Sequence, residues 1–143
     1  MKKTSSLQKY NRLVFFFSLL GMAIAIYVLQ SFLRKISIAC LNSGCDQVRG
    51  NPASYIFNIP VPAFGLIGYS ILAIFSFLRS VKDTQKLLRI ILGISTFGFF
   101  FVAWFTYTEI FVIKAICTWC AVSAILMTTI FLLSLKSYKL LQT

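Results

Sequence analysis

Residues 13–33 read LVFFFSLLGMAIAIYVLQSFL, a mainly apolar run that contains no charged side chain. About 20 helical residues of this kind cross the hydrocarbon core of a bilayer, which is roughly 30 Å thick. The run is longer than the apolar core of a cleaved signal peptide, which has about 7 to 15 residues. It therefore predicts a retained transmembrane helix.

Three more runs of this character follow, at residues 61–78, 87–113 and 116–135. The chain of 143 residues is 59% hydrophobic and only 12% charged, whereas soluble domains have about 25% charged residues. Spanning segments must be helices or closed barrels, because lipid offers the backbone no hydrogen-bond partners, and these runs are too long for barrel strands. We expect an all-α protein, an integral membrane four-helix bundle that forms a single transmembrane domain over residues 1–143.

Basic residues are distributed unequally between the two ends of this expected bundle. Ten of the fourteen lie before the first span, between the second and third spans, or after the fourth: Lys2, Lys3, Lys9, Arg12, Arg79, Lys82, Lys86, Arg89, Lys136 and Lys139. The opposite side has only Arg34, Lys35, Arg49 and Lys114. The positive-inside rule therefore predicts that both termini are cytoplasmic. The net charge of +11 then reflects topology and attraction to anionic headgroups, and we expect no nucleic-acid partner.

The four cysteines form two pairs, and both pairs fall on the non-cytoplasmic side of this topology. Cys40 and Cys45 lie in the first outer loop, and Cys117 and Cys120 lie at the outer end of the fourth span. An even number of thiols on an oxidising face is typical of disulfide chemistry.

The second pair has the sequence Cys-Thr-Trp-Cys, at residues 117–120. This spacing places the two sulfur atoms one helical turn apart, where they can close a reversible disulfide. The position of Cys117 near a helix N-terminus stabilises its thiolate, and Lys114 adds to this effect. The alternative is that both cysteines are only small buried hydrophobic residues.

The first pair is separated by Asn42, Ser43 and Gly44, which are turn-forming residues. A disulfide on such a loop is able to meet an outside protein and then return to the second pair. A static structural disulfide is the alternative. A zinc site made of all four sulfurs is a third interpretation, but it would distort the fourth helix, so we expect no metal.

The remainder of the first outer loop predicts a short interfacial half-helix over residues 52–57. Asn51 fits the N-cap and Pro52 the first helical position. Gly65 and Gly68 give the second span a small face that suits close helix packing. The half-helix would form a lid over the outer end of the bundle.

Electrons that reach the second cysteine pair need an acceptor. The chain has no histidine and no flavin-binding motif, so a membrane quinone is the simplest candidate. Trp119 is a candidate for contact with its ring. The aromatic run at 97–107 either lines one wall of such a site or mainly faces lipid and neighbouring helices. Glu109 is either a proton donor for quinone reduction or, as we expect, a solvated or Lys114-paired carboxylate.

Two functions of another class also fit four apolar helices. A transporter normally carries an ionisable residue near the middle of the bilayer, and these spans have none there. A non-enzymatic scaffold has no need of two differently placed thiol pairs. Both remain alternatives to a redox enzyme.

The pattern Cys-loop-Cys-x-x-Val, Ile-Pro-x-Pro-x-x-Gly and Cys-x-Trp-Cys, over roughly residues 12–131, resembles the vitamin K epoxide reductase family, in particular its bacterial members. The residues that carry the resemblance are Cys40, Cys45, Val48, Pro60, Gly65, Cys117 and Cys120. The resemblance implies a four-helix bundle around a quinone, in a bacterial cytoplasmic membrane with the cysteines on the outer side. It also implies that the protein reoxidises a separate extracytoplasmic thioredoxin-fold thiol oxidase.

The resemblance further implies a role for each cysteine. Cys40 meets the partner, Cys45 relays to Cys117, and Cys120 delivers electrons to the quinone. Quinone contacts are expected at four positions: Trp119, Val61, Asn51 and Phe64. Relatives often have serine at the position of Asn51, asparagine at that of Val61 and glycine at that of Asn58. Reduction of vitamin K epoxide or quinone is the alternative activity within the family.

Overall fold

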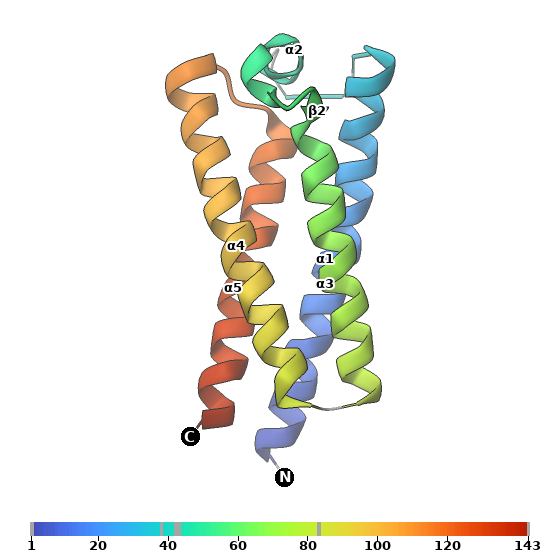
Figure 1. Cartoon of the computed structure of the whole chain (residues 1–143), viewed down its shortest axis with the longest axis vertical. Coiled ribbons are helices and arrows are strands. Elements are labelled where there is room, and N and C mark those ends of the chain that lie inside the picture. The colour runs from blue at the N-terminus through green and yellow to red at the C-terminus, as the bar shows by residue number, and fades with distance from the viewer. Residues whose placement is uncertain (1, 38, 42–43, 83, 143) are drawn as a thin grey trace.

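The computed structural model describes residues 2–37, 39–41, 44–82 and 84–142. Four long helices run side by side along an elongated bundle (Figure 1): α1 Lys2–Arg34, α3 Val61–Val81, α4 Gln85–Thr108 and α5 Thr118–Gln142. Each of them is long and apolar enough to cross a membrane. The expected all-α membrane bundle is therefore confirmed.

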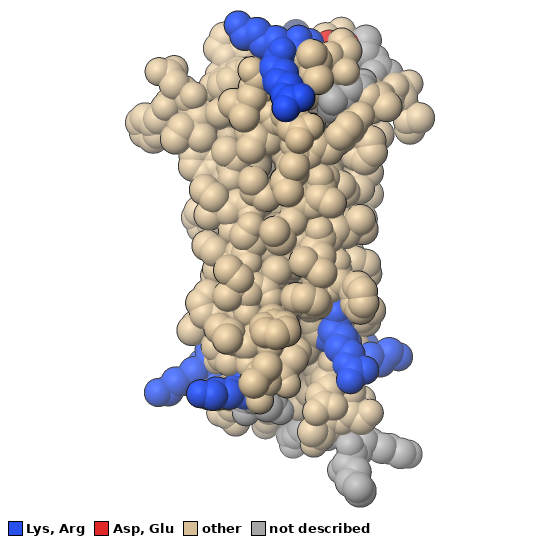
Figure 2. Space-filling model, turned by 90° about the vertical axis from the view of Figure 1, so that its right-hand side faces the viewer, with Lys and Arg blue, Asp and Glu red and all other residues tan. Residues whose placement is uncertain are grey.

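The connections of the bundle separate into two ends. Figure 1 shows both termini and the link between α3 and α4 at one end, and the segment that carries the first cysteine pair at the other. On the face drawn in Figure 2, Lys and Arg side chains gather at the two ends and leave an uncharged belt between them. This belt is the surface that a lipid environment requires.

Helix α1 packs against α3 and α5, and α4 packs against α5 and α3. A buried hydrophobic cluster joins the four helices: Val14, Tyr69, Leu72, Ile91, Met127 and Ile130. One close approach in this region involves Gly21 of α1 and the ring of Tyr69 on α3. A Cβ atom on Gly21 would lie 2.4 Å from that ring. The ring therefore fits against α1 because glycine has no side chain.

The outer loop folds into a compact lid, which we define as residues 44–60. It contains the seven-residue helix α2, Gly44–Gly50, one 3-10 turn, Pro52–Ser54, and a hairpin of β1, Tyr55–Ile56, with β2, Ile59–Pro60. In the hairpin Tyr55 faces Pro60 and Ile56 faces Ile59.

The predicted half-helix over residues 52–57 is wrong in its extent. Asn51 does cap a helical turn, since its side chain accepts a hydrogen bond from the Ala53 N–H at 2.9 Å. The turn ends at Ser54 because the chain must reverse before α3. Phe57 and Asn58 make this reversal with positive φ angles of 52° and 65°, and the longer helix, α2, precedes Asn51.

The link from α4 to α5 is also irregular. Residues Glu109–Ile113 form a π-helical turn, and Lys114 adopts a left-handed conformation with φ of 58°. Helix α5 begins at Thr118, so residues 116 and 117, which were assigned to the fourth span, lie before the helix. Cys117 is its N-cap, since its carbonyl oxygen accepts a hydrogen bond from the Ala121 N–H at 3.0 Å.

The contact between Gly21 and Tyr69 leads to a stability prediction. Gly21→Ala should lower the free energy of unfolding by about 1–3 kcal/mol, because the added methyl group overlaps a buried ring. Denaturation of the protein in detergent measures this change. Gly93→Ala is the matched control, since a Cβ there meets nothing within 4 Å and alanine favours helix by about 1 kcal/mol. Equal stability of Gly21→Ala and wild type would contradict the packing.

Candidate functional site

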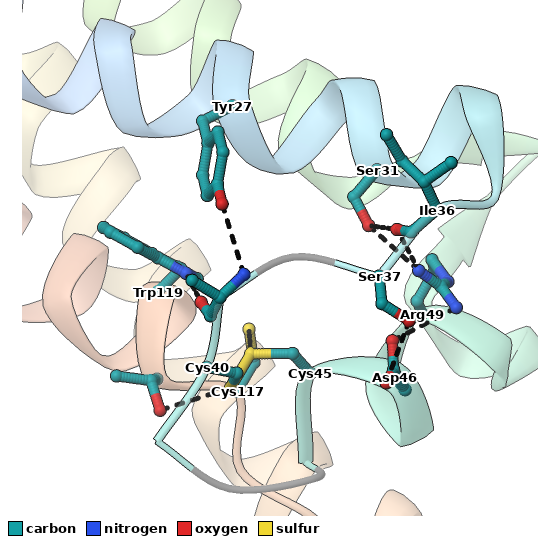
Figure 3. Close-up of a disulfide and its surroundings, with 12 residues drawn as sticks. Tyr27, Ser31, Ile36, Ser37, Cys40, Cys45, Asp46, Arg49, Cys117 and Trp119 are labelled. Atoms are coloured by element: carbon teal, nitrogen blue, oxygen red, sulfur yellow. Dashed lines mark hydrogen bonds and ion pairs between the residues drawn. A yellow bond between two sulfur atoms is a disulfide. The ribbon is translucent and has the colours of Figure 1, made fainter.

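The two cysteine pairs meet under the lid. Cys40 and Cys45 form a disulfide, and Cys117 and Cys120 are free thiols. The Cys117 sulfur lies 3.1 Å from that of Cys45, although 72 positions separate them in the sequence. Figure 3 shows this arrangement, with Cys117 directly beside the disulfide. A sulfur in contact with a disulfide it does not belong to is in position for thiol–disulfide exchange.

The start of α5 sets the pKa of the Cys117 thiol. The hydrogen bond with the Cys120 thiol lowers the pKa of Cys117 to about 7 from a usual value of 9.0. Burial opposes this shift, and the backbone N–H groups of Cys120 and Trp119 reinforce it. Lys114, which we expected to assist, is exposed and is not among the groups that lower this pKa.

The segment before Cys40 is held by two aromatic side chains. The indole N–H of Trp119 donates a hydrogen bond to the Ala39 carbonyl at 2.5 Å, and the Ala39 N–H donates to the Tyr27 hydroxyl at 3.2 Å. The two rings pack edge to face with centroids 5.2 Å apart (Figure 3). In addition, Thr118 Oγ1 lies 3.3 Å from the Cys40 sulfur. Residues next to the second cysteine pair thus position the first pair.

Arg49 fastens the opposite side of the lid to the end of α1. Its guanidinium donates hydrogen bonds to Ser31 Oγ, at 3.1 Å, and to the Ile36 carbonyl, and it forms an ion pair with Asp46 at 3.1 Å (Figure 3). In the sequence, Arg49 stands out only as one of the four basic residues on the expected outer side. The i, i+3 spacing of Asp46 and Arg49 was the one available signal that they share a helix.

A cavity of about 640 Å³ lies between the four helices below the lid. Val61, Phe64, Trp119 and Cys120 are among the residues that line it. Asn51 does not belong to the lining, and its side chain is engaged in the helix cap. The cavity therefore reaches from Cys120 into the apolar interior of the bundle.

The lining of this cavity is almost entirely apolar. Its hydroxyl groups are those of Tyr69 and Ser123, and the Tyr69 hydroxyl donates to the Ser123 carbonyl at 2.8 Å and lies 3.0 Å from Ser123 Oγ. Gly65 and Gly68 line the cavity as well, and a Cβ on either meets nothing within 4 Å. The expectation that these glycines permit close helix packing is therefore wrong, since they face open space.

The aromatic run of α4 divides between two surroundings. Three of its members, spaced four residues apart, line the cavity: Phe97, Phe101 and Phe105, although 74% of Phe97 is also exposed. Three others are exposed on the outside of the bundle: Phe100, Trp104 and Tyr107. Because of the helical periodicity, the run both lines the cavity and faces the outside of the bundle.

Glu109 is buried, so the expectation of a solvated or Lys114-paired carboxylate is wrong. Only 1% of the residue is exposed, whereas Lys114 lies on the surface. The Glu109 carboxyl group is hydrogen-bonded to the thiol of Cys120 and to the backbone N–H of Cys117. Glu109 is the first residue of the π-helical turn in the link from α4 to α5. Among the described residues, no group of His, Cys, Asp and Glu is arranged to hold a metal ion.

Comparison with known proteins agrees with this geometry. A family model described as the vitamin K epoxide reductase family matches residues 12–135, which include both cysteine pairs and all four long helices in large part. A search of curated proteins found no match.

The environment of Cys117 leads to a pH prediction. Its alkylation by a small, membrane-permeant reagent should rise with pH and be half-maximal near pH 7, because only the thiolate reacts. In Cys120→Ala the midpoint should move to higher pH, since the largest stabilising contact is lost. Mass spectrometry of the alkylated peptide measures both. Lys114→Gln is the control and should leave the midpoint in place, and an unchanged midpoint in Cys120→Ala would contradict the assignment.

Proposed function

The chain belongs to the vitamin K epoxide reductase family, and from this we propose that it transfers electrons from a separate thioredoxin-fold thiol oxidase, through its two cysteine pairs, to a quinone. The contact of 3.1 Å between the sulfurs of Cys45 and Cys117 is the observation that carries this proposal. It joins a loop disulfide to a thiol pair that borders an apolar cavity.

The relay begins at the loop disulfide. A thiolate of the partner attacks Cys40, which breaks the Cys40–Cys45 bond and leaves Cys45 as a thiolate. The second thiolate of the partner then attacks the partner's own sulfur in the mixed disulfide, which oxidises the partner and frees Cys40. The partner loses two electrons in these two exchanges, and the loop pair gains them.

The second half of the relay returns the loop to its oxidised state. The Cys45 thiolate attacks Cys117 of a Cys117–Cys120 disulfide, so that a Cys45–Cys117 bond forms and Cys120 leaves as a thiolate. Cys40 then attacks Cys45, which restores the loop disulfide and releases Cys117. The structure has the sulfur bonding that follows this step, with the loop pair oxidised and the second pair reduced.

The cavity fits a quinone by size and by chemistry. Its volume of about 640 Å³ lies within the range of roughly 300–1,000 Å³ for small-molecule sites, and its lining is apolar. Val61, Phe64 and Trp119 would contact the ring or its tail, and the hydroxyls of Tyr69 and Ser123 are the polar side chains that would orient a carbonyl. A quinone bound there would supply an acceptor for two electrons and two protons, and Cys120, which lines the cavity, would deliver the electrons.

The exposed side of the lid suits a protein partner. Leu41, which follows Cys40 directly, is 92% exposed, and Phe57 at the tip of the hairpin is 93% exposed. Apolar residues beside a redox disulfide provide a docking surface for a partner thiol oxidase. The ten basic residues at the other end of the bundle support an inner-membrane location with both termini cytoplasmic and the cysteines outside.

Quinone consumption tests the proposed function. The purified protein in detergent is mixed, without oxygen, with a reduced thioredoxin-fold oxidase and a soluble quinone, and the quinone absorbance is followed. Wild type should consume quinone rapidly, whereas Cys117→Ser should reduce the rate to background because the relay has no acceptor for Cys45. Equal rates in both proteins, or no consumption of several quinones by wild type with intact thiols, would contradict the proposal.

Trapping of the partner tests the order of the loop cysteines. In Cys45→Ala, incubated with the oxidised partner, the Cys40 thiolate should attack the partner's disulfide and accumulate as a mixed disulfide with it, visible as a slower band on a non-reducing gel. Cys40→Ala is the matched variant and should give little adduct, because Cys45 is only 5% exposed beneath the lid. An adduct that forms equally in both variants, or only in Cys40→Ala, would reverse the assignment.

A further inference from the structure

The relay described above leaves one buried acid without a role. Glu109 is 1% exposed at the end of α4, where the π-helical turn begins, and its Oε1 atom has no hydrogen-bond partner. Burial of a carboxyl group is costly, and acids kept within membrane segments usually serve proton or ion chemistry.

The surroundings of the Glu109 carboxyl group consist of the second cysteine pair. From the start of α5 it meets the Cys120 thiol, the Cys117 thiol and the Cys117 backbone N–H. The charged residues of the lid helix α2, Asp46 and Arg49, pair with each other. The thiols of the second pair are thus the titratable groups that act on Glu109, and no described basic side chain forms an ion pair with it.

Oxidation of the Cys117–Cys120 dithiol to a disulfide releases two electrons and two protons. Cys117 is half ionised near neutral pH, so its proton is lost readily. The Cys120 thiol faces an apolar cavity on one side and Glu109 on the other. Within the part of the chain that the structure describes, the Glu109 carboxylate is the one acidic side chain in contact with this thiol.

We propose that Glu109 is the proton acceptor of Cys120 during oxidation of the second cysteine pair. In this step the S–H bond of Cys120 breaks and an O–H bond forms on Glu109. The S–S bond between Cys117 and Cys120 forms as two electrons pass to the quinone, which takes up two protons from water, and Glu109 returns the proton of Cys120 to water. The proposal rests on the proposed function, because it concerns the last step of the same relay.

A purely structural role for Glu109 makes a different prediction. The hydrogen bond from the Cys117 N–H to the carboxyl group also ties the end of α4 to the start of α5. Glu109→Gln keeps the shape of the side chain and an oxygen that accepts this hydrogen bond, but the amide cannot take up a proton. Glu109→Asp keeps an acid on a shorter side chain. The two variants therefore separate proton exchange from helix linkage.

The experiment measures two reactions of the full-length protein over a range of pH. The first is quinone reduction as above. The second needs no quinone and follows oxidation of the Cys117–Cys120 dithiol by diamide, which takes up the two electrons and two protons. Glu109→Gln should slow both by about 100-fold, the lower end of the range for general acid–base catalysis, and should lose the limb of the pH–rate profile that belongs to the carboxylate. Reduction of the Cys40–Cys45 disulfide by the partner, in the same variant, is the internal control and should be unchanged.

Wild-type rates and an unchanged pH profile in Glu109→Gln would overturn the proposal. Should Glu109→Gln fail to fold, Glu109→Asp decides: a profile that keeps the carboxylate limb supports proton exchange, and a folded variant that has lost the limb overturns it. The experiment distinguishes failure of the proposed function from failure of the proposal for Glu109. Wild-type protein that does not reduce quinone, but whose oxidation by diamide depends on Glu109, contradicts the quinone acceptor and leaves the role of Glu109 in place.

Discussion

The contact between the sulfurs of Cys45 and Cys117 joins a short helix of the lid to a long helix of the bundle. Cys117 lies at the cap of a long membrane helix, whereas Cys45 lies on a seven-residue helix that packs over the end of the bundle. A short helix has little stability of its own, so tertiary contacts must hold it. The site therefore depends on how firmly the lid is attached.

That attachment comes from both sides of the disulfide. Trp119 and Tyr27 hold the backbone of Ala39, and Arg49 joins α2 to the end of α1. Only the Arg49 side includes a full ion pair, and it is partly exposed, where such pairs contribute little. The lid is thus fastened by a few polar contacts above a small apolar cluster. This combination is consistent with a loop that opens to a partner and returns to Cys117.

The interior of the bundle below the lid contains open space. The bundle leaves a large apolar cavity instead of closing its core, and the glycines of α3 help to keep it open. Cys120 lies on its wall, and Glu109 lies behind Cys120. In the proposed relay, the Cys120 sulfur would pass electrons toward the cavity, and Glu109 would take up the thiol proton on the other side of Cys120.

The sequence alone determined the helical membrane fold and the pairing of the cysteines into a loop pair and a helix pair. Both follow from local rules, since about 20 apolar residues must form a helix in lipid and a Cys-x-x-Cys spacing places two sulfurs on one face. The capping role of Asn51 is local too, and it was predicted correctly. Only the tertiary structure decided the extent of the lid helix, the placement of Glu109 beside the thiols, the clamp made by Arg49 and the open space beside Gly65 and Gly68. Each of these depends on contacts between residues far apart in the chain, and a π-helical turn or a positive φ angle at Lys114 leaves no periodic pattern in the sequence from which it can be inferred.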